Sequence, residues 1–302
     1  MNKKGLLLVF GTAMISGFSV FINKYGVAMN NPYVFAFLKN LAVAVLLASL
    51  IMAVKEYKFL RRVSVKQWGL LALIGIVGGG IPFLLFFKGL SLTSAAQGSF
   101  IQKTMFLYVA LLAVVFLKEK LSKSFLAGAI LLLGANLLLL KSFNFSFGRG
   151  DLLIFCATLF WAIENIISKY ALKNLSGNIV ACSRMLFGSV FIAGFLLFTG
   201  QITQVLALNF SQIGWIALTT LFLLGYTFTW YNGLKYVPVS VATAILMLGS
   251  PVTTLLAALS SGKLIAKDIF ASFIIITGLT IIIGLDYVFK KIRFCKNFNL
   301  IP

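Results

Sequence analysis

Long apolar stretches separated by short polar segments follow one another along almost the whole chain. A membrane-spanning helix needs about 20 apolar residues, and only helices or closed barrels satisfy their backbone polar groups in lipid. These stretches are much longer than the alternating strands of a barrel. The pattern therefore predicts an all-α membrane protein with ten transmembrane helices, at 5–24, 33–54, 67–87, 94–117, 124–140, 151–170, 178–199, 213–234, 239–259 and 268–289.

Composition agrees with this pattern and changes how the charge is interpreted. Of the 302 residues, 61% are hydrophobic and 11% are charged, whereas about a quarter of the residues in a soluble domain are charged. The formal net charge is +20. In a membrane protein, cationic loops orient the helices and contact anionic headgroups. We therefore expect the basic loops to interact with membrane lipids and not with nucleic acid.

The distribution of Lys and Arg predicts the orientation. With the N-terminus inside, the segments on the cytoplasmic side hold 17 of these residues and the outer segments hold 6. Cytoplasmic loops carry the excess of positive charge. We expect a multi-pass protein of the plasma membrane, with both termini, the loop 55–66 and the tail 290–302 in the cytoplasm. The first apolar run is long for a signal-peptide core and no small-residue cleavage site follows it, so we expect it to be retained.

The two halves of the chain repeat each other. After a shift of 145 residues, Lys24 meets Lys169 and Lys39 meets Arg184, and a shift of 144 aligns much of the remainder. An odd number of crossings per repeat inserts the second copy upside down, and inverted repeats are the usual build of secondary transporters. The sequence thus predicts two inverted five-helix repeats. Their expected extents are 1–145 and 146–302.

Several segments resemble a known family. Half one contains NKYGVAMNNPYVFAFLKN and GLSLTSAAQGSFIQKTMF, and half two contains ATLFWAIENIISKY and GLKYVPVSVATAILMLGSPVTT. With these segments, residues 5–288 resemble the EamA-type branch of the drug/metabolite transporter superfamily. The resemblance implies transport of amino acids, amphipathic metabolites or drug-like compounds. It also implies a cavity lined by helices one, three, four, six, eight and nine, with five and ten peripheral. The sequence departs from the family pattern in having Ser16 opposite Trp161, and no carboxylate opposite Glu119.

Charged residues inside a span are expensive and are functional candidates by default. Lys103 lies about nine residues into the fourth span, too deep to reach a surface, with Gln102 beside it. We expect Lys103 to anchor an anionic or carboxylate-bearing solute; the alternative is a structural lysine that caps carbonyls or pairs with a carboxylate. Glu164 is the only acid well inside a span. It is a candidate for proton coupling or for binding a substrate amine, with an ion pair to Arg184 or Lys169 as the structural alternative.

Two further basic residues and a group of aromatic residues complete the candidate binding site. Arg184 and Lys39 lie six or seven residues into the second span of their halves, roughly 10 Å from a surface. Long basic side chains reach that far, so bonds to loop carbonyls are the favoured role, and Arg184 is kept as a candidate substrate ligand. Aromatic residues are common at membrane interfaces, but four of them form a candidate wall for an organic solute: Trp161, Trp230, Tyr226 and Tyr231.

Glycine and proline should weaken or kink the third and ninth spans. Such breaks act as hinges in alternating access, or allow close helix packing as small residues do in membranes. The sequence favours neither reading over the other. The candidate hinge residues are Gly79, Gly80, Pro82, Gly249 and Pro251.

The leading hypothesis is a secondary transporter that exports small organic metabolites, driven by a proton or solute gradient because the sequence has no nucleotide-binding motif. The alternatives are an importer or exchanger of an anionic metabolite, and a channel or non-transporting scaffold. A membrane enzyme would need clustered acids, His or metal ligands, and the chain has no His. We therefore expect no enzyme, no metal and no cofactor, with a small-molecule solute as partner. The oligomeric state stays open.

Overall fold

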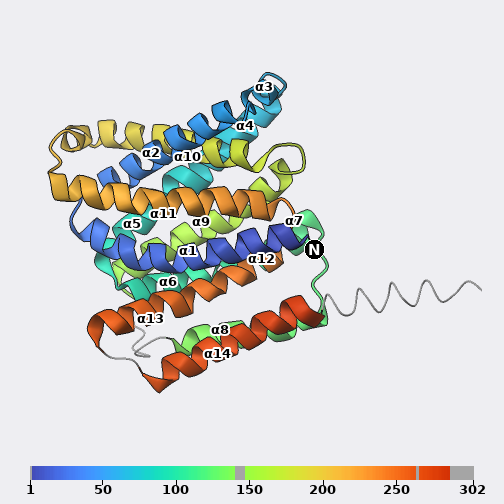
Figure 1. The fold of residues 1–302 in the computed structure, drawn as a ribbon. Coiled ribbons are helices and arrows are strands. Elements are labelled where there is room, and N and C mark those ends of the chain that lie inside the picture. The colour runs from blue at the N-terminus through green and yellow to red at the C-terminus, as the bar shows by residue number, and fades with distance from the viewer. Residues whose placement is uncertain (1, 140–146, 263–264, 286–302) are drawn as a thin grey trace, which may run out of the picture.

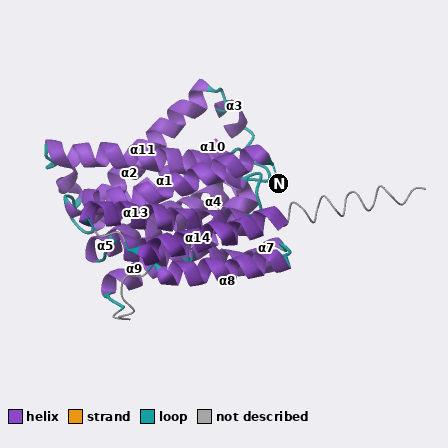
Figure 2. Ribbon diagram, turned by 60° about the horizontal axis from the view of Figure 1, so that its bottom comes forward, coloured by secondary structure: helices purple, strands orange, loops and turns teal. Residues whose placement is uncertain are grey.

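A computed structural model describes residues 2–139, 147–262 and 265–285, and within these ranges the chain is helical, with short loops and no strand (Figures 1 and 2). The first half contains α1 (Lys3–Ala28), α2 (Pro32–Ala53), α3 (Tyr57–Leu60), α4 (Val65–Ile74), η1 (Gly75–Gly80), α5 (Ile81–Leu92), α6 (Ala95–Lys103), α7 (Met105–Leu117) and α8 (Lys123–Leu138). The second contains α9 (Arg149–Ala171), α10 (Gly177–Phe198), η2 (Ile202–Val205), α11 (Phe210–Leu234), α12 (Val239–Ile245), η3 (Leu246–Leu248), α13 (Gly249–Ser261), α14 (Ala266–Thr280) and η4 (Ile281–Leu285).

Nine helical segments of the described chain are long and apolar enough to cross a membrane, which confirms a multi-pass helical protein. Consecutive pieces such as α4–η1–α5 count as one segment. The remaining apolar helix, α8, has 16 residues, which corresponds to about 24 Å. This is shorter than the roughly 30 Å hydrocarbon core, so the tenth crossing stays a prediction. The end of the last expected span and the tail 290–302 lie outside the described residues.

Short polar side chains set where many of these helices begin. Their oxygens accept a hydrogen bond from a backbone N–H of the first turn, which would otherwise lack a partner. In two helices, α4 and α11, the third residue is a Gln that bonds back to the cap, the reciprocal arrangement of a capping box. The capping residues are Asn2, Asn31, Ser64, Ser94, Ser122, Ser176 and Asn209.

The packing of the helices follows the sequence repeat. α1 packs along α11, and its repeat counterpart α9 packs along α5, which is the counterpart of α11. α2 packs against its own counterpart α10, and α8 against its counterpart α14. The α8–α14 pair forms one edge of the bundle, and both helices lie at the bottom of Figure 1.

One pair of repeat-related lysines has the same structural role in both halves. Lys24 donates from Nζ to the backbone oxygens of Leu90 (2.9 Å) and Ser91 (3.4 Å), just where α5 ends. Lys169 donates to the oxygens of Leu234, Lys235 and Val237, at 2.6, 3.4 and 2.7 Å, where α11 ends. The last carbonyls of a helix have no intrahelical partner, and a cation there also opposes the helix dipole. Each lysine therefore ties the first helix of its half to the end of the third.

The third, fourth and ninth spans each contain a break in the α-helix. η1 is a π-helical turn between α4 and α5. The fourth span breaks at Thr104, between α6 and α7, and the ninth breaks at the 3₁₀ turn η3, which contains Leu248. Thr104 and Leu248 are 144 residues apart, so the two breaks are at equivalent positions of the repeat.

Segments that the charge pattern assigns to one side of the membrane gather at one end of the bundle. Glu56 accepts a hydrogen bond from Ser176 (2.7 Å), and Glu119 accepts one from the backbone N–H of Val239 (2.9 Å). All four residues lie in or beside segments expected in the cytoplasm, and which end is cytoplasmic stays a prediction. Contacts at the opposite end join segments expected outside, namely Asn31 with Gln201, Thr93 with Asp151 and Tyr25 with Ser260.

Candidate functional site

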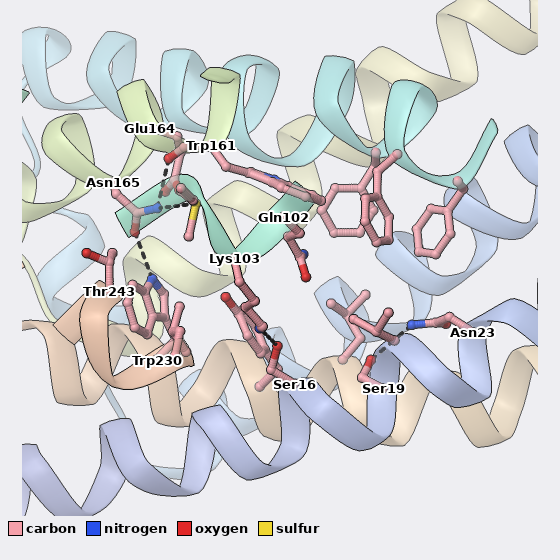
Figure 3. A pocket seen from close by; sticks show the side chains of 18 of the residues that line it. Ser16, Ser19, Asn23, Gln102, Lys103, Trp161, Glu164, Asn165, Trp230 and Thr243 are labelled. Carbon is pink, nitrogen blue, oxygen red and sulfur yellow. Dashed lines mark hydrogen bonds between the residues drawn. The ribbon is translucent and has the colours of Figure 1, made fainter. Parts of the chain in front are cut away.

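A cavity lies between the two halves, and its described lining comes from every span except α8 and α14. It offers about 70 Å³ to the centres of water molecules, and one water needs roughly 10–15 Å³ of such space. Figure 3 shows polar side chains converging on it from α1, α6, α9, α11 and α12. The lining residues are Ser16, Ser19, Val20, Asn23, Lys39, Phe83, Phe86, Phe87, Gln102, Lys103, Met105, Trp161, Glu164, Asn165, Arg184, Leu223, Tyr226, Trp230, Thr243 and Leu246.

Lys103 is the last residue of α6, directly before the break at Thr104. Its side chain is 4% exposed, and Nζ donates a 2.6 Å hydrogen bond to Oγ of Ser16 on α1 (Figure 3). A Cβ on Gly249 would lie 3.0 Å from the same Nζ. The glycine at the start of α13 thus leaves room for the amine. A lysine amine has three donors, and Ser16 is the only acceptor assigned to it among the described residues.

Lys39 occupies the cavity from α2, which corrects the expectation that it bonds loop carbonyls near the surface. It is 1% exposed, and its Nζ donates to Oδ1 of Asn23. The amine also lies 4.7 Å from the ring centroids of both Phe35 and Phe87. Ring faces attract cations at this distance. Depth along a helix fixes the distance to water but not the direction of the side chain, and Lys39 extends inward.

Arg184 sits at the equivalent position of the second half and also extends into the cavity. Its guanidinium carbon lies 5.3 Å from the ring centroid of Phe83 and 5.9 Å from that of Tyr231. The side chain is 4% exposed, Nε is fully buried without an acceptor, and no hydrogen bond joins the guanidinium to the described residues. The expected bonds to loop carbonyls are absent from the described structure because the side chain is enclosed by aromatic rings.

Glu164 is held by two hydroxyl groups. Its Oε1 accepts hydrogen bonds from Oγ of Ser168, one turn later on α9, and from the Tyr231 hydroxyl at 2.6 Å. The structure shows no salt bridge between Glu164 and a described residue, so the ion pair with Arg184 or Lys169 is not formed. Arg184 is nevertheless a close neighbour, since a Cβ on Gly78 would lie within 3.0 Å of both side chains.

The tryptophans are fixed by a hydrogen-bonded series. Trp161 donates from Nε1 to the backbone oxygen of Gly78 at 2.9 Å, a carbonyl of the π-helical turn η1. Asn165 donates to the Trp161 carbonyl (2.8 Å) and accepts from Nε1 of Trp230 (3.1 Å). Both indoles therefore have set orientations. Gln102 is different, because its buried Oε1 has no donor among the described residues.

The profile of the EamA-like transporter family matches residues 3–141 and, a second time, residues 148–284. The chain belongs to the EamA-like transporter family. It is 28% identical over 282 residues to the uncharacterized transporter YyaM of Bacillus subtilis, covering 88% of this chain and 91% of that protein. It is 30% identical over 115 residues to an uncharacterized transporter of Methanothermobacter thermautotrophicus, covering 36% of this chain and 34% of that protein. A solved crystal structure, 16% identical with a TM-score of 0.75 over 94% of this chain and 98% of that one, shares the fold.

The family resemblance inferred from sequence is thus confirmed, and this EamA-like chain is a membrane transporter. All five residues predicted to bind substrate line the one cavity described above: Gln102, Lys103, Trp161, Glu164 and Arg184. Their binding role stays a prediction. α8 and α14 contribute nothing to its described lining, but α2 and α10 do, which the resemblance did not imply.

None of the candidate hinge residues belongs to the described lining of the cavity. A Cβ on Gly79 would lie 2.2 Å from the backbone oxygen of Arg184, and one on Gly188 would lie 2.5 Å from the Gly79 backbone. Close packing of η1 on α10 is therefore present, and hinge motion stays a prediction. Pro82 lies in the first turn of α5, and Pro251 in the first turn of α13.

The cavity residues that sequence reasoning missed include the polar side chains of Lys39, Asn23 and Asn165. The signal for Lys39 was its equivalence with Arg184, since two buried cations at one repeat position share an environment. Asn23 and Asn165 gave no signal, because an isolated amide in an apolar helix is unremarkable until its partner is known.

Proposed function

We propose that this EamA-like protein is a secondary transporter that exports small organic metabolites, such as amino acids or related amphipathic solutes, across the plasma membrane by alternating access. The observation that carries the proposal is the position of the cavity. It lies between two repeats, next to helix breaks at Thr104 and η3. Discontinuous helices near mid-depth, at a repeat interface, are where secondary transporters bind their solutes.

The direction of the helices supports an inverted repeat of five crossings. Tyr33 and Ala44 of α2 contact Phe195 and Cys182 of α10, respectively. The start of α2 thus lies beside the end of α10, so counterpart helices run antiparallel. α8 and the α14–η4 segment behave in the same way, since Gly128 lies against Ile282 and the later Leu132 lies against the earlier Gly278. Two copies of one fold in opposite orientations give two states of similar energy, open to opposite sides.

Lys103 is the proposed anchor for a carboxylate group of the solute. Its amine has spare donors beside Ser16, and the neighbouring Gln102 has a carbonyl oxygen without a donor. An amino acid carries both an acceptor for the amine and donors for that oxygen. Trp161 and Trp230 would contact its apolar part.

The test is solute counterflow in proteoliposomes. A secondary transporter loaded inside with unlabelled solute should accumulate labelled solute transiently and saturably, and a channel should only equilibrate it. A metabolite panel of amino acids and organic acids identifies the class of solute. Equilibration without counterflow for every permeant solute would favour the channel alternative. Uptake against efflux in oriented vesicles then decides between exporter and importer.

A further inference from the structure

We infer that the transported solute is an organic anion with two negative charges, and that Arg184 and Lys39 form a second anionic subsite beyond Lys103. The inference rests on the proposed transport function and deepens it. It specifies an acidic solute where the function above requires only one carboxylate.

The charge of the lining is the first argument. The described lining holds three basic side chains, Lys39, Lys103 and Arg184, and one acidic side chain, Glu164. The basic groups therefore outnumber the acidic group by two. Uncompensated charge inside a membrane protein is costly, and a solute with two negative charges would neutralise it.

The unpaired guanidinium is the second argument. Arginine stays charged in proteins and presents five N–H donors, yet Arg184 has no acceptor among the described residues and its Nε is fully enclosed. The carboxylate of Glu164 lies nearby but forms no hydrogen bond or salt bridge with Arg184 in the described structure, and both of its hydrogen bonds, from Ser168 and Tyr231, go to Oε1. A buried charged donor left without an acceptor is strongly unfavourable. A carboxylate or phosphate group of the solute would supply the acceptors, and guanidinium binds both in a bidentate manner.

Lys24 and Lys169, the scaffold lysines, show what a structural role looks like, and Lys39 and Arg184 differ from them. Lys24 and Lys169 are also repeat-related cations within helices, and each bonds two or three backbone oxygens. Lys39 and Arg184 bond to no backbone oxygen in the described structure. Lys39 lies over Phe87 and Arg184 lies over Phe83, and these two rings are direct neighbours with centroids 5.6 Å apart.

The aromatic lining indicates an organic solute and not an inorganic ion. Trp161 packs against Phe86 and Phe83, with ring centroids 5.1 and 5.9 Å apart. All three rings line the cavity together with polar groups from α6 and α10. An inorganic anion would gain nothing from these surfaces, whereas a carbon chain between two acidic groups would contact them.

The experiment varies charge at nearly constant size. Thermal stability of the purified protein in detergent is measured with succinate, succinamate and succinamide, which carry two, one and no carboxylates. Each lost charge-assisted hydrogen bond should weaken binding by roughly 10- to 150-fold, so the protective concentration should rise in that order. Glycerol 3-phosphate against glycerol shows whether a phosphate group serves as well as two carboxylates. Equal protection by succinate and succinamide, or no protection by either dianion, would overturn the inference.

Variants locate the second subsite. Arg184→Gln should remove the difference between succinate and succinamate, Arg184→Lys should keep part of it, and the exposed Lys66→Gln should leave it unchanged. If Arg184→Gln does not fold, Lys39→Gln tests the same difference. A full preference for succinate in a folded Arg184→Gln protein would contradict the assignment.

Counterflow distinguishes failure of this inference from failure of the proposed function. Saturable counterflow of neutral or zwitterionic solutes, without any dianion, would overturn the charge argument and leave the transporter intact. Absence of counterflow for every permeant solute would defeat both.

Discussion

The two halves of the molecule share a scaffold and differ at the cavity. Lys24 and Lys169 occupy equivalent positions and tie equivalent helix ends. In contrast, the cavity contact between Ser16 and Lys103 has no counterpart, because the equivalent positions hold Trp161 and Met247. A residue that is kept at equivalent positions of both halves therefore serves the fold. A residue that occurs in only one half is not required by the fold.

Lys39 and Arg184 are intermediate between the repeated scaffold lysines and the unrepeated Ser16–Lys103 contact. Their position repeats and both are cations, but one contacts an amide and two rings while the other has rings alone. We propose that a ligand contacted by both halves accounts for these repeated cations, which have no backbone partners. Substitutions at the repeated scaffold positions should thus lower stability, and substitutions at the unrepeated cavity positions should lower transport.

The largest effect is expected at Gly79, in the π-helical turn that α11 of the other half lacks. Gly79→Ala places a Cβ 2.2 Å from the backbone oxygen of Arg184, so α10 must shift. Overpacking of this kind typically costs about 1–3 kcal/mol and more against backbone, and we expect strong loss of folded protein. Gly69→Ala is the matched control, because nothing lies within 4 Å of that site. The yield of monodisperse protein and its melting temperature measure the difference, and similar values for both variants would show that η1 tolerates separation from α10.

The next effect concerns the unrepeated cation. Lys103→Met copies the residue of the second half, so the scaffold should accept it and expression should stay near normal. Transport of a carboxylate-bearing solute should weaken by roughly 10- to 150-fold in apparent affinity, because one charge-assisted hydrogen bond is lost. Counterflow with Lys66→Gln as the control measures this. A variant that fails to accumulate would make Lys103 structural, and unchanged affinity would redirect the search to Glu164.

The repeated scaffold lysines should behave in the opposite way. Lys24→Gln and Lys169→Gln each remove charged hydrogen bonds to helix-terminal carbonyls, worth about 1.5–3 kcal/mol apiece at buried sites and less here because both side chains are partly exposed. The effect should be larger for Lys169, which has three acceptors where Lys24 has two. Both melting temperatures should fall while solute affinity is retained. A change in affinity without a change in stability would contradict the division between scaffold and site.

The sequence predicted nine spans that the described structure contains, and it predicted which segments gather at each end of the bundle. Both depend on averages, namely hydropathy over about 20 residues and charge over loops. It predicted Lys103 as a cavity residue because no surface was within its reach. It did not predict the partners of Glu164. Ser168 is one turn away, but Tyr231 comes from α11, 67 residues later, and only tertiary packing brings them together. The π-helical turn was foreseen as a weak point from its glycines, yet its close fit to α10 depends on Gly188, which no local pattern singles out.

The smallest effect tests whether the Ser16–Lys103 contact acts as one unit. Ser16→Ala removes the acceptor of the 2.6 Å bond while leaving the amine in place. A hydrogen bond to a charged group contributes about 1.5–3 kcal/mol, but here the freed donor still faces a cavity with room for water. We therefore expect less than about a tenfold change in apparent affinity, since a bridging water replaces most of the lost interaction. If Ser16 acts only by positioning Lys103, then Ser16→Ala should add nothing to Lys103→Met, and the double variant should match the single one in a double-mutant cycle. Additive losses in counterflow affinity would instead mean that Ser16 contacts the solute itself. Ser16 and Lys103 would then bind the solute independently of each other.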